Sequence, residues 1–218
     1  MLSLVMMTKN SDHYVERLLQ QAKFFADKIY ILVDDSTTDK TYDLCKDYAT
    51  HIEKVKSPGY IEPVLSYLYD LPDTEWIIRL DDDELLGSRF IDNKAKILDT
   101  DMVAFWMPRY AVVHKEHYFA NQPMYPDYQL RLFRKGRIVQ PPIIHVTPTI
   151  LGKSGMLNAH IFHMKFMYKS RFERAAIQKR YESIRQGAGT NTNYAPHQIP
   201  EEYYRGAIRQ CEEKPYEV

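Results

Sequence analysis

The chain has 218 residues, 44% of them hydrophobic, and its 29 basic residues balance 29 acidic ones. Such a chain is an ordinary globular protein that buries about 70% of its unfolded surface, and zero net charge favours neither nucleic acid nor an anionic membrane as partner. We find no membrane-spanning stretch, and the apolar N-terminal run is too short for a signal peptide. With Cys45 and Cys211 interpreted as reduced thiols, we expect a cytoplasmic protein, at most peripheral to a membrane.

The first part of the sequence alternates strand-like and helix-like segments. Short apolar runs predict strands at residues 2–7, 29–33 and 76–80, and we expect a further short strand at residues 51–55. Apolar residues at three- and four-residue spacing predict helices at residues 15–25 and around residues 61–68. Ser36 and Asp39 have the spacing of a capping box, which predicts a further helix from about Thr38 to Tyr48.

This alternation with short connections predicts an α/β fold, in which a doubly wound, mostly parallel sheet carries helices on both faces. The last strand of the series runs directly into four acids, Asp81 to Glu84. Neighbouring carboxylates repel each other, so a divalent cation would stabilise such a cluster. Strand alternation would place Asp81 and Asp83 on one face and Asp82 and Glu84 on the other. A solvated acidic turn or a helix N-cap is the alternative interpretation.

Polar residues follow three of the predicted strands. Thr8 follows the first, Asp34 the second, and the acidic run the fourth. Because the carboxyl ends of parallel strands meet at one edge of a sheet, we expect these side chains to converge on one crevice.

Three segments, taken together, resemble the family 2 glycosyltransferases with the GT-A fold. These are residues 2–41, which end in VDDSTTDKT, the acidic segment WIIRLDDDE, and PDYQLRLFR at residues 126–134, which resembles bacterial enzymes that extend surface glycans of the lipopolysaccharide core type. The match is imperfect, since Ser36 and Lys40 stand where the family usually has glycine.

The resemblance implies a role for each matching residue. Thr8 and Asp34 would contact the base and ribose of a nucleotide-sugar donor, for which we expect a UDP-sugar. Asp81 would reach the ribose or a metal-bound water, and Asp83 would bind the Mn²⁺ or Mg²⁺ that bridges the diphosphate. Asp82 and Glu84 would then be structural, with Glu84 a weaker candidate for the acceptor side.

Asp127 occupies the position that resembles the general base of an inverting transferase. A turn-capping aspartate after Pro126 is its alternative role. Arg131 alternates with apolar neighbours and is a candidate for contact with phosphate or a carboxylate, or a plain structural arginine.

Two histidines are candidates because each would close a strand near the active edge. His163 follows an apolar stretch and would supply a nitrogen ligand to the metal, with a structural role as the alternative. His145 follows Pro141–Ile144, and a structural role is preferred for it.

The resemblance divides the chain into a transferase domain, residues 1–168, and a C-terminal segment, residues 169–218. Residues 1–100 form the donor half and residues 101–168 the acceptor half, in which Tyr110, Tyr118, Tyr125 and Tyr128 are candidates to face the acceptor. Residues 170–185 predict a basic helix with a Ser170 cap, either solvated or in contact with phosphates, and residues 201–211 predict a short helix.

The function expected from these features is inverting, metal-dependent sugar transfer to a hydroxyl group. The acceptor stays open among a glycan, a lipid-linked glycan and a modified nucleic-acid base, because loops build that side of the fold. The alternatives are a nucleotidyltransferase, a receiver-like module that binds Mg²⁺ without catalysis, and a degenerate transferase that only binds its ligand.

Overall fold

The computed structural model describes residues 1–121, 124–188 and 208–217. Its helices are α1 (Val15–Phe25), α2 (Thr41–Lys46), α3 (Glu62–Asp70), α4 (Ser88–Leu98), α5 (Lys165–Tyr168) and α6 (Arg171–Ile184). Its strands are β1 (Leu2–Thr8), β2 (Lys28–Asp34), β3 (His51–Val55), β4 (Trp76–Arg79), β5 (Glu84–Leu86), β6 (Ala104–His114), β7 (His117–Phe119), β8 (Asp127–Arg134), β9 (Ile138–Val139), β10 (Thr149–Ile150), β11 (Ser154–Met156), β12 (Ile161–His163) and β13 (Ile208–Gln210).

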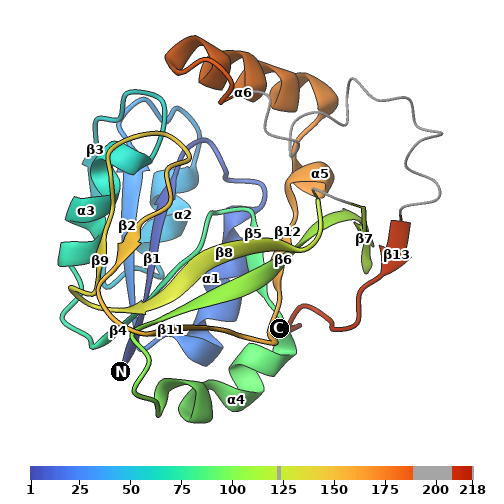
Figure 1. The fold of residues 1–218 in the computed structure, drawn as a ribbon. Helices are drawn as coiled ribbons and strands as arrows, with labels where there is room; N and C mark the ends of the chain where they lie inside the picture. Colours follow the sequence, from blue (N-terminus) through green and yellow to red (C-terminus); the bar gives the residue numbers. More distant parts are fainter. Residues whose placement is uncertain (122–123, 189–207, 218) are drawn as a thin grey trace.

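A mixed sheet forms the centre of the molecule (Figure 1). Strands β3, β2, β1 and β4 are parallel and adjacent in that order. Beyond them, β8 runs antiparallel to β4, and β6 runs antiparallel to β8. The predicted α/β class is therefore confirmed, with a parallel half that carries Thr8, Asp34 and the acidic run and an antiparallel extension that carries Asp127.

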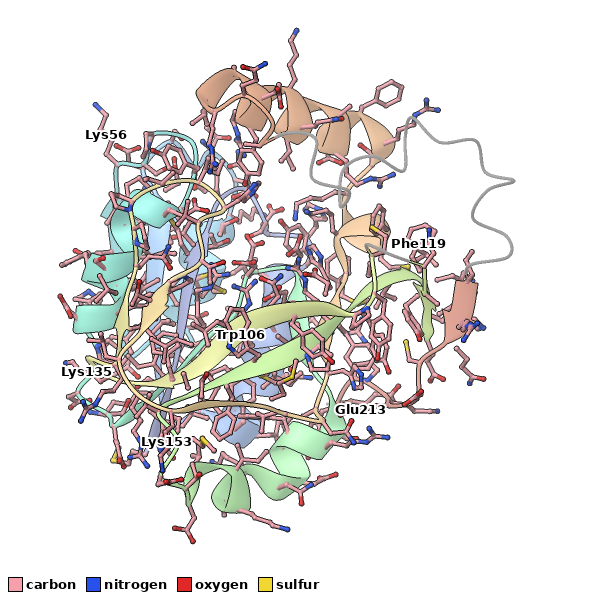
Figure 2. The ribbon with its side chains drawn as sticks, in the orientation of Figure 1. Lys56, Trp106, Phe119, Lys135, Lys153 and Glu213 are labelled. Atoms are coloured by element: carbon pink, nitrogen blue, oxygen red, sulfur yellow. The ribbon has the colours of Figure 1, made fainter. Side chains whose placement is uncertain are left out.

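The side chains of β1 point alternately to the two faces of the parallel half of the sheet, and on each face they pack against a helix. Leu4 and Met6 belong to the apolar cluster that includes α1, whereas Val5 belongs to the cluster that includes Leu65 and Leu68 of α3. These are the apolar helix faces that the sequence predicted. Side chains from these elements fill the space between the sheet and its helices (Figure 2).

Three local predictions were wrong. Helix α2 starts only at Thr41, because the hydroxyl and backbone N–H of Ser36 donate to the Asp34 carboxylate instead of capping a helix at Thr38. His145 closes no strand; it lies in a turn with a φ of 59°. Of residues 201–211, those up to 207 lie outside the described part of the chain, and Ile208–Gln210 is a strand paired with β7.

Helix α6 confirms the predicted C-terminal helix and its cap. Ser170 and Glu173 form a reciprocal capping box at its N-terminus. The helix lies across the carboxyl edge of the parallel strands (Figure 1) and has no fully buried residue. None of the helices in the described part of the chain is long and apolar enough to cross a membrane.

Candidate active site

A cavity of about 810 Å³ opens at the carboxyl edge of the parallel strands. All the residues singled out as donor, metal or catalytic candidates line it: Thr8, Asp34, Asp81, Asp83, Asp127, Arg131 and His163. Helix α6 closes part of its mouth with Ala176, Ile177, Arg180 and Tyr181. The convergence expected from parallel strand ends is therefore present.

The acidic segment forms a turn and does not continue strand β4. Strand β4 ends at Arg79, and the turn lies at Asp82 and Asp83, where the N–H of Glu84 donates to the carbonyl of Asp81 at 3.0 Å. The assumption of strand alternation was therefore wrong: the three aspartates Asp81–Asp83 all line the cavity, and the fully buried Glu84 starts β5 beneath them.

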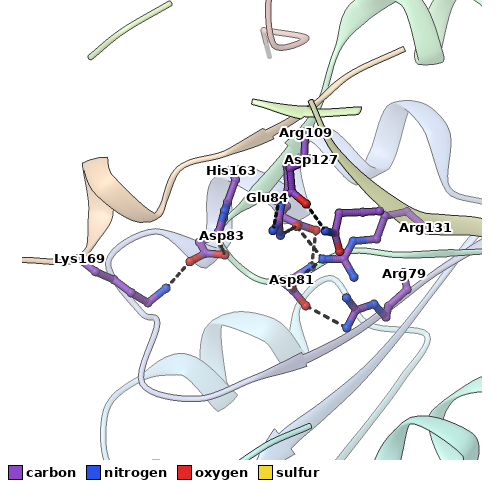
Figure 3. Close-up of polar contacts among 10 residues, drawn as sticks. Arg79, Asp81, Asp83, Glu84, Arg109, Asp127, Arg131, His163 and Lys169 are labelled. Atoms are coloured by element: carbon purple, nitrogen blue, oxygen red, sulfur yellow. Dashed lines mark hydrogen bonds and ion pairs between the residues drawn. The ribbon is translucent and has the colours of Figure 1, made fainter. Parts of the chain in front are cut away.

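Two arginines from the antiparallel strands hold Glu84 (Figure 3). Arg109 and Arg131 donate to its carboxylate at 2.8 and 2.7 Å, and Arg131 also donates to Asp81 at 2.6 Å. Burial and Asp81 raise the pKa of Glu84 to about 8, although Arg109 and Arg79 oppose that shift. Arg131 is thus occupied by carboxylates and lies almost entirely inside the protein.

Asp127 is the first residue of β8, and its carboxylate is hydrogen-bonded to Arg109. Both Nε and Nη2 of Arg109 donate to Asp127 Oδ2, at 2.9 and 2.6 Å, and Gln129 donates to Oδ1 at 2.7 Å. Burial opposes ionisation, but Arg109 and these hydrogen bonds lower the pKa of Asp127. The carboxylate is therefore charged at neutral pH and held in one orientation, with 21% of its side chain exposed to the cavity.

At the end of β2, Asp34 accepts hydrogen bonds from the hydroxyls of Ser36 and Ser57, and Lys9 lies 3.3 Å away. Burial would raise the pKa of Asp34, but these partners lower it to about 2. Thr8 donates to Asp82 at 2.7 Å, which connects the end of β1 to the acidic turn.

Replacing Asp34 with asparagine should reduce the free energy of unfolding by about 2 kcal/mol at neutral pH, since its folded pKa lies below the ordinary 3.8. A lowered carboxyl pKa stabilises the fold above the unfolded pKa, and that stability is lost as the pH falls through the folded pKa. In denaturant titrations, the gap between wild type and Asp34→Asn should therefore close between about pH 4 and about pH 2. A gap that stays constant over this interval would contradict the assignment.

Asp83 has two nitrogen neighbours. Lys169 Nζ lies 2.5 Å from Asp83 Oδ2, and His163 Nε2 lies 3.4 Å from Oδ1 (Figure 3). Burial and Arg109 lower the pKa of His163 to about 4, so its imidazole is neutral at pH 7. Its Nδ1 is buried and has no hydrogen-bond partner among the residues that the structure describes.

The model of the family described as "Glycosyl transferase family 2" matches residues 3–152. The chain belongs to glycosyl transferase family 2. No curated protein sequence matches it. Among solved structures, S. aureus TarS is similar in fold, with a TM-score of 0.53 and 13% identity over 83% of this chain and 39% of the TarS chain. A TarS fragment, residues 1–349, gives a TM-score of 0.51 at 11% identity over 94% of this chain and 73% of that one.

The same TarS fragment in complex with UDP gives a TM-score of 0.52 at 12% identity, over 83% of this chain and 65% of that one. At these identities the similarity establishes a shared fold. It confirms the GT-A-like architecture that the resemblance implied.

Asp83 and His163 suit a divalent metal of the kind that the family resemblance implies. A carboxylate and a neutral imidazole 3.4 Å apart provide two hard or borderline donors that one ion can share. Within residues 1–121, 124–188 and 208–217, no group of three or more His, Cys, Asp or Glu side chains is placed to hold a metal.

Sequence reasoning missed several basic residues of this family 2 site. Arg79, Arg109 and Lys169 all line the cavity and pair with its carboxylates. The signal for the two arginines was present, because each is a single charge inside an apolar, strand-like run and must find a partner when buried. Of the four tyrosines expected to face the acceptor, Tyr128 alone lines this cavity, whereas Tyr110 and Tyr118 are core residues.

Proposed function

We propose that the protein is an inverting glycosyltransferase that moves a sugar from a nucleotide-diphosphate donor, a UDP-sugar, to a hydroxyl group. The observation that carries this proposal is the shared cavity, in which Asp34 and the acidic turn Asp81–Asp83 lie with Asp127. The UDP held by the similar TarS fragment supports the choice of donor.

The two halves of the cavity bind different substrates, one the donor and the other the acceptor. Residues 1–100 bind the donor: Asp34, fixed by two serines, accepts from the base or ribose, and Thr8 and Asp81 line the ribose side. Arg131 holds Asp81 in place from below, which makes its contribution to the donor indirect. Mn²⁺ or Mg²⁺ held by Asp83 and His163 would stabilise the negative charge that develops on the diphosphate.

Residues 101–168 bind the acceptor. Asp127 takes the proton of the attacking hydroxyl, and Arg109 keeps its carboxylate ionised and oriented for that step. Trp106 and Tyr128 line the same side of the cavity and suit a sugar ring, which polar aromatic side chains bind by stacking. A glycan or lipid-linked glycan of the bacterial surface, such as a lipopolysaccharide core, is the acceptor that we favour over a modified base.

A panel of nucleotide sugars, each with and without Mn²⁺, tests the donor site by thermal unfolding. A bound donor at 100 times its dissociation constant should add about 2.7 kcal/mol to the free energy of unfolding. UDP-sugars should give the largest shift, and Asp83→Ala should remove its Mn²⁺-dependent part. Asp92→Ala is the matched control, because Asp92 is exposed on α4 and does not line the cavity. The proposal fails if no nucleotide sugar changes the unfolding temperature.

A further inference from the structure

The Asp83 carboxylate, assigned above to a metal, already binds a cation of the protein itself. Lys169 Nζ lies 2.5 Å from Asp83 Oδ2, and the same ammonium lies over the ring of Tyr14, 4.7 Å from its centroid. The side chains of Lys169 and Asp83 are only 16% and 5% exposed. In an ion pair that is so weakly solvated, the attraction between the two charges is much stronger than in a pair on the surface.

This contact and a metal compete for the same carboxylate. Lys169 lies on Oδ2, whereas His163, the other candidate metal ligand, lies on Oδ1. A divalent ion shared by Oδ1 and His163 would bind Asp83 at about 2.0–2.6 Å and would place its double charge beside the ammonium. Charge repulsion therefore favours the departure of Lys169 from Asp83 when a metal binds.

Hydrogen bonds fix the backbone around Lys169, but its side chain can change conformation within the cavity. The N–H of Lys169 donates to Lys165, its carbonyl accepts from Arg174 at 2.5 Å, and Ser170 caps α6 directly after it. A flexible stem of four carbon atoms separates this anchored backbone from the ammonium, and Lys169 lines the same cavity as the residues proposed to bind the donor. A diphosphate beside Asp83 would offer the displaced ammonium new oxygen partners.

We propose that Lys169 is an exchangeable cation of the donor site: its ammonium occupies Asp83 in the free protein and moves to the donor diphosphate when a divalent metal takes its place. This inference rests on the proposed function and adds a donor-positioning residue to it. It follows that the free protein binds metal weakly and that nucleotide diphosphate and metal strengthen each other's binding, because the nucleotide gives the displaced Lys169 a new partner.

Mn²⁺ binding, followed by electron paramagnetic resonance of the free ion, tests this without any turnover. The full chain is titrated with Mn²⁺, with and without UDP, as wild type, Lys169→Met and Lys169→Gln. Removing the ammonium should tighten Mn²⁺ binding in the absence of UDP by about tenfold or more, and it should shrink the factor by which UDP tightens Mn²⁺ binding in the wild type. Lys169→Arg, which keeps the charge, should stay close to the wild type.

Lys179→Met is the matched control, because Lys179 is exposed on α6 and does not line the cavity; it should bind Mn²⁺ like the wild type. Circular dichroism establishes that each variant is folded. Two neutral substitutions are used so that the test still works if one of them does not fold. Unchanged or weaker Mn²⁺ binding by a folded neutral variant would overturn the inference while leaving the proposed function intact, provided that UDP still binds. If the wild type bound neither Mn²⁺ nor UDP, both would fall.

Discussion

Asp127→Asn should lower kcat by about 100-fold to 10,000-fold, the contribution of a positioned general base. Asparagine has nearly the same shape and its amide oxygen can still accept from Arg109, but it cannot take the proton of the attacking hydroxyl. Donor binding should be unchanged, because the contacts of Asp127 are with Arg109 and Gln129 and not with the acidic turn. Transfer assays and UDP-sugar titrations of the same preparation separate the two quantities.

The pH profile of the wild type provides an independent check. Because Arg109 and Gln129 lower the pKa of Asp127, the acid limb of kcat/KM should lie below the usual range of an aspartate. Asp92→Asn serves as the control substitution and should leave both limbs in place. Retained transfer by Asp127→Asn would exclude the base role, whereas loss of UDP-sugar binding would move Asp127 to the donor site.

The parallel half of the fold was predictable from sequence because its elements are locally encoded. Strands β1, β2 and β4 are short apolar runs buried in the sheet, and α1 and α3 show helical spacing of their apolar residues. Each pattern depends on neighbouring residues alone, so no knowledge of the rest of the chain is needed to recognise it.

The turn at Asp81–Asp83 was not predicted because it depends on residues that are distant in the sequence. Side chains would alternate between the two faces only if strand β4 continued through the acidic run. Instead, the N–H of Glu84 donates to the carbonyl of Asp81 and closes a turn, and Arg109 and Arg131 bind Glu84 in the core. Those arginines are 25 and 47 residues away in sequence. No pattern around the acidic run announces such partners.

The cavity itself was predicted better than its electrostatics. Thr8, Asp34 and the acidic turn converge because parallel strands end at one edge, which is a property of topology. The sequence suggested that a metal must relieve the repulsion among the acids. In the structure, Lys9, Arg79, Arg109, Arg131 and Lys169 each lie against one of these carboxylates, so basic side chains provide much of that compensation.

Arg109→Met should be among the most destabilising substitutions in the chain, with a loss of about 3 to 5 kcal/mol in the free energy of unfolding. Arg109 is buried and donates to Glu84, which is completely buried, and to Asp127. Methionine fills much of the volume but removes one arginine hydrogen bond of Glu84 and both arginine hydrogen bonds of Asp127, so the charged and largely buried Asp127 carboxylate loses its main compensating charge. Urea unfolding monitored by circular dichroism measures the change.

The double variant Arg109→Met/Asp127→Asn distinguishes charge from packing. If an uncompensated buried carboxylate causes the loss, neutralising Asp127 should restore part of the stability; if lost packing causes it, the double variant should be no more stable than Arg109→Met. Lys153→Met is the control, because its ion pair with Asp101 is about 70% exposed on both sides and should contribute at most about 1 kcal/mol. A loss for Arg109→Met no larger than for this control would mean that the network beneath the acidic turn does not stabilise the fold, and its role would then be confined to orienting Asp127.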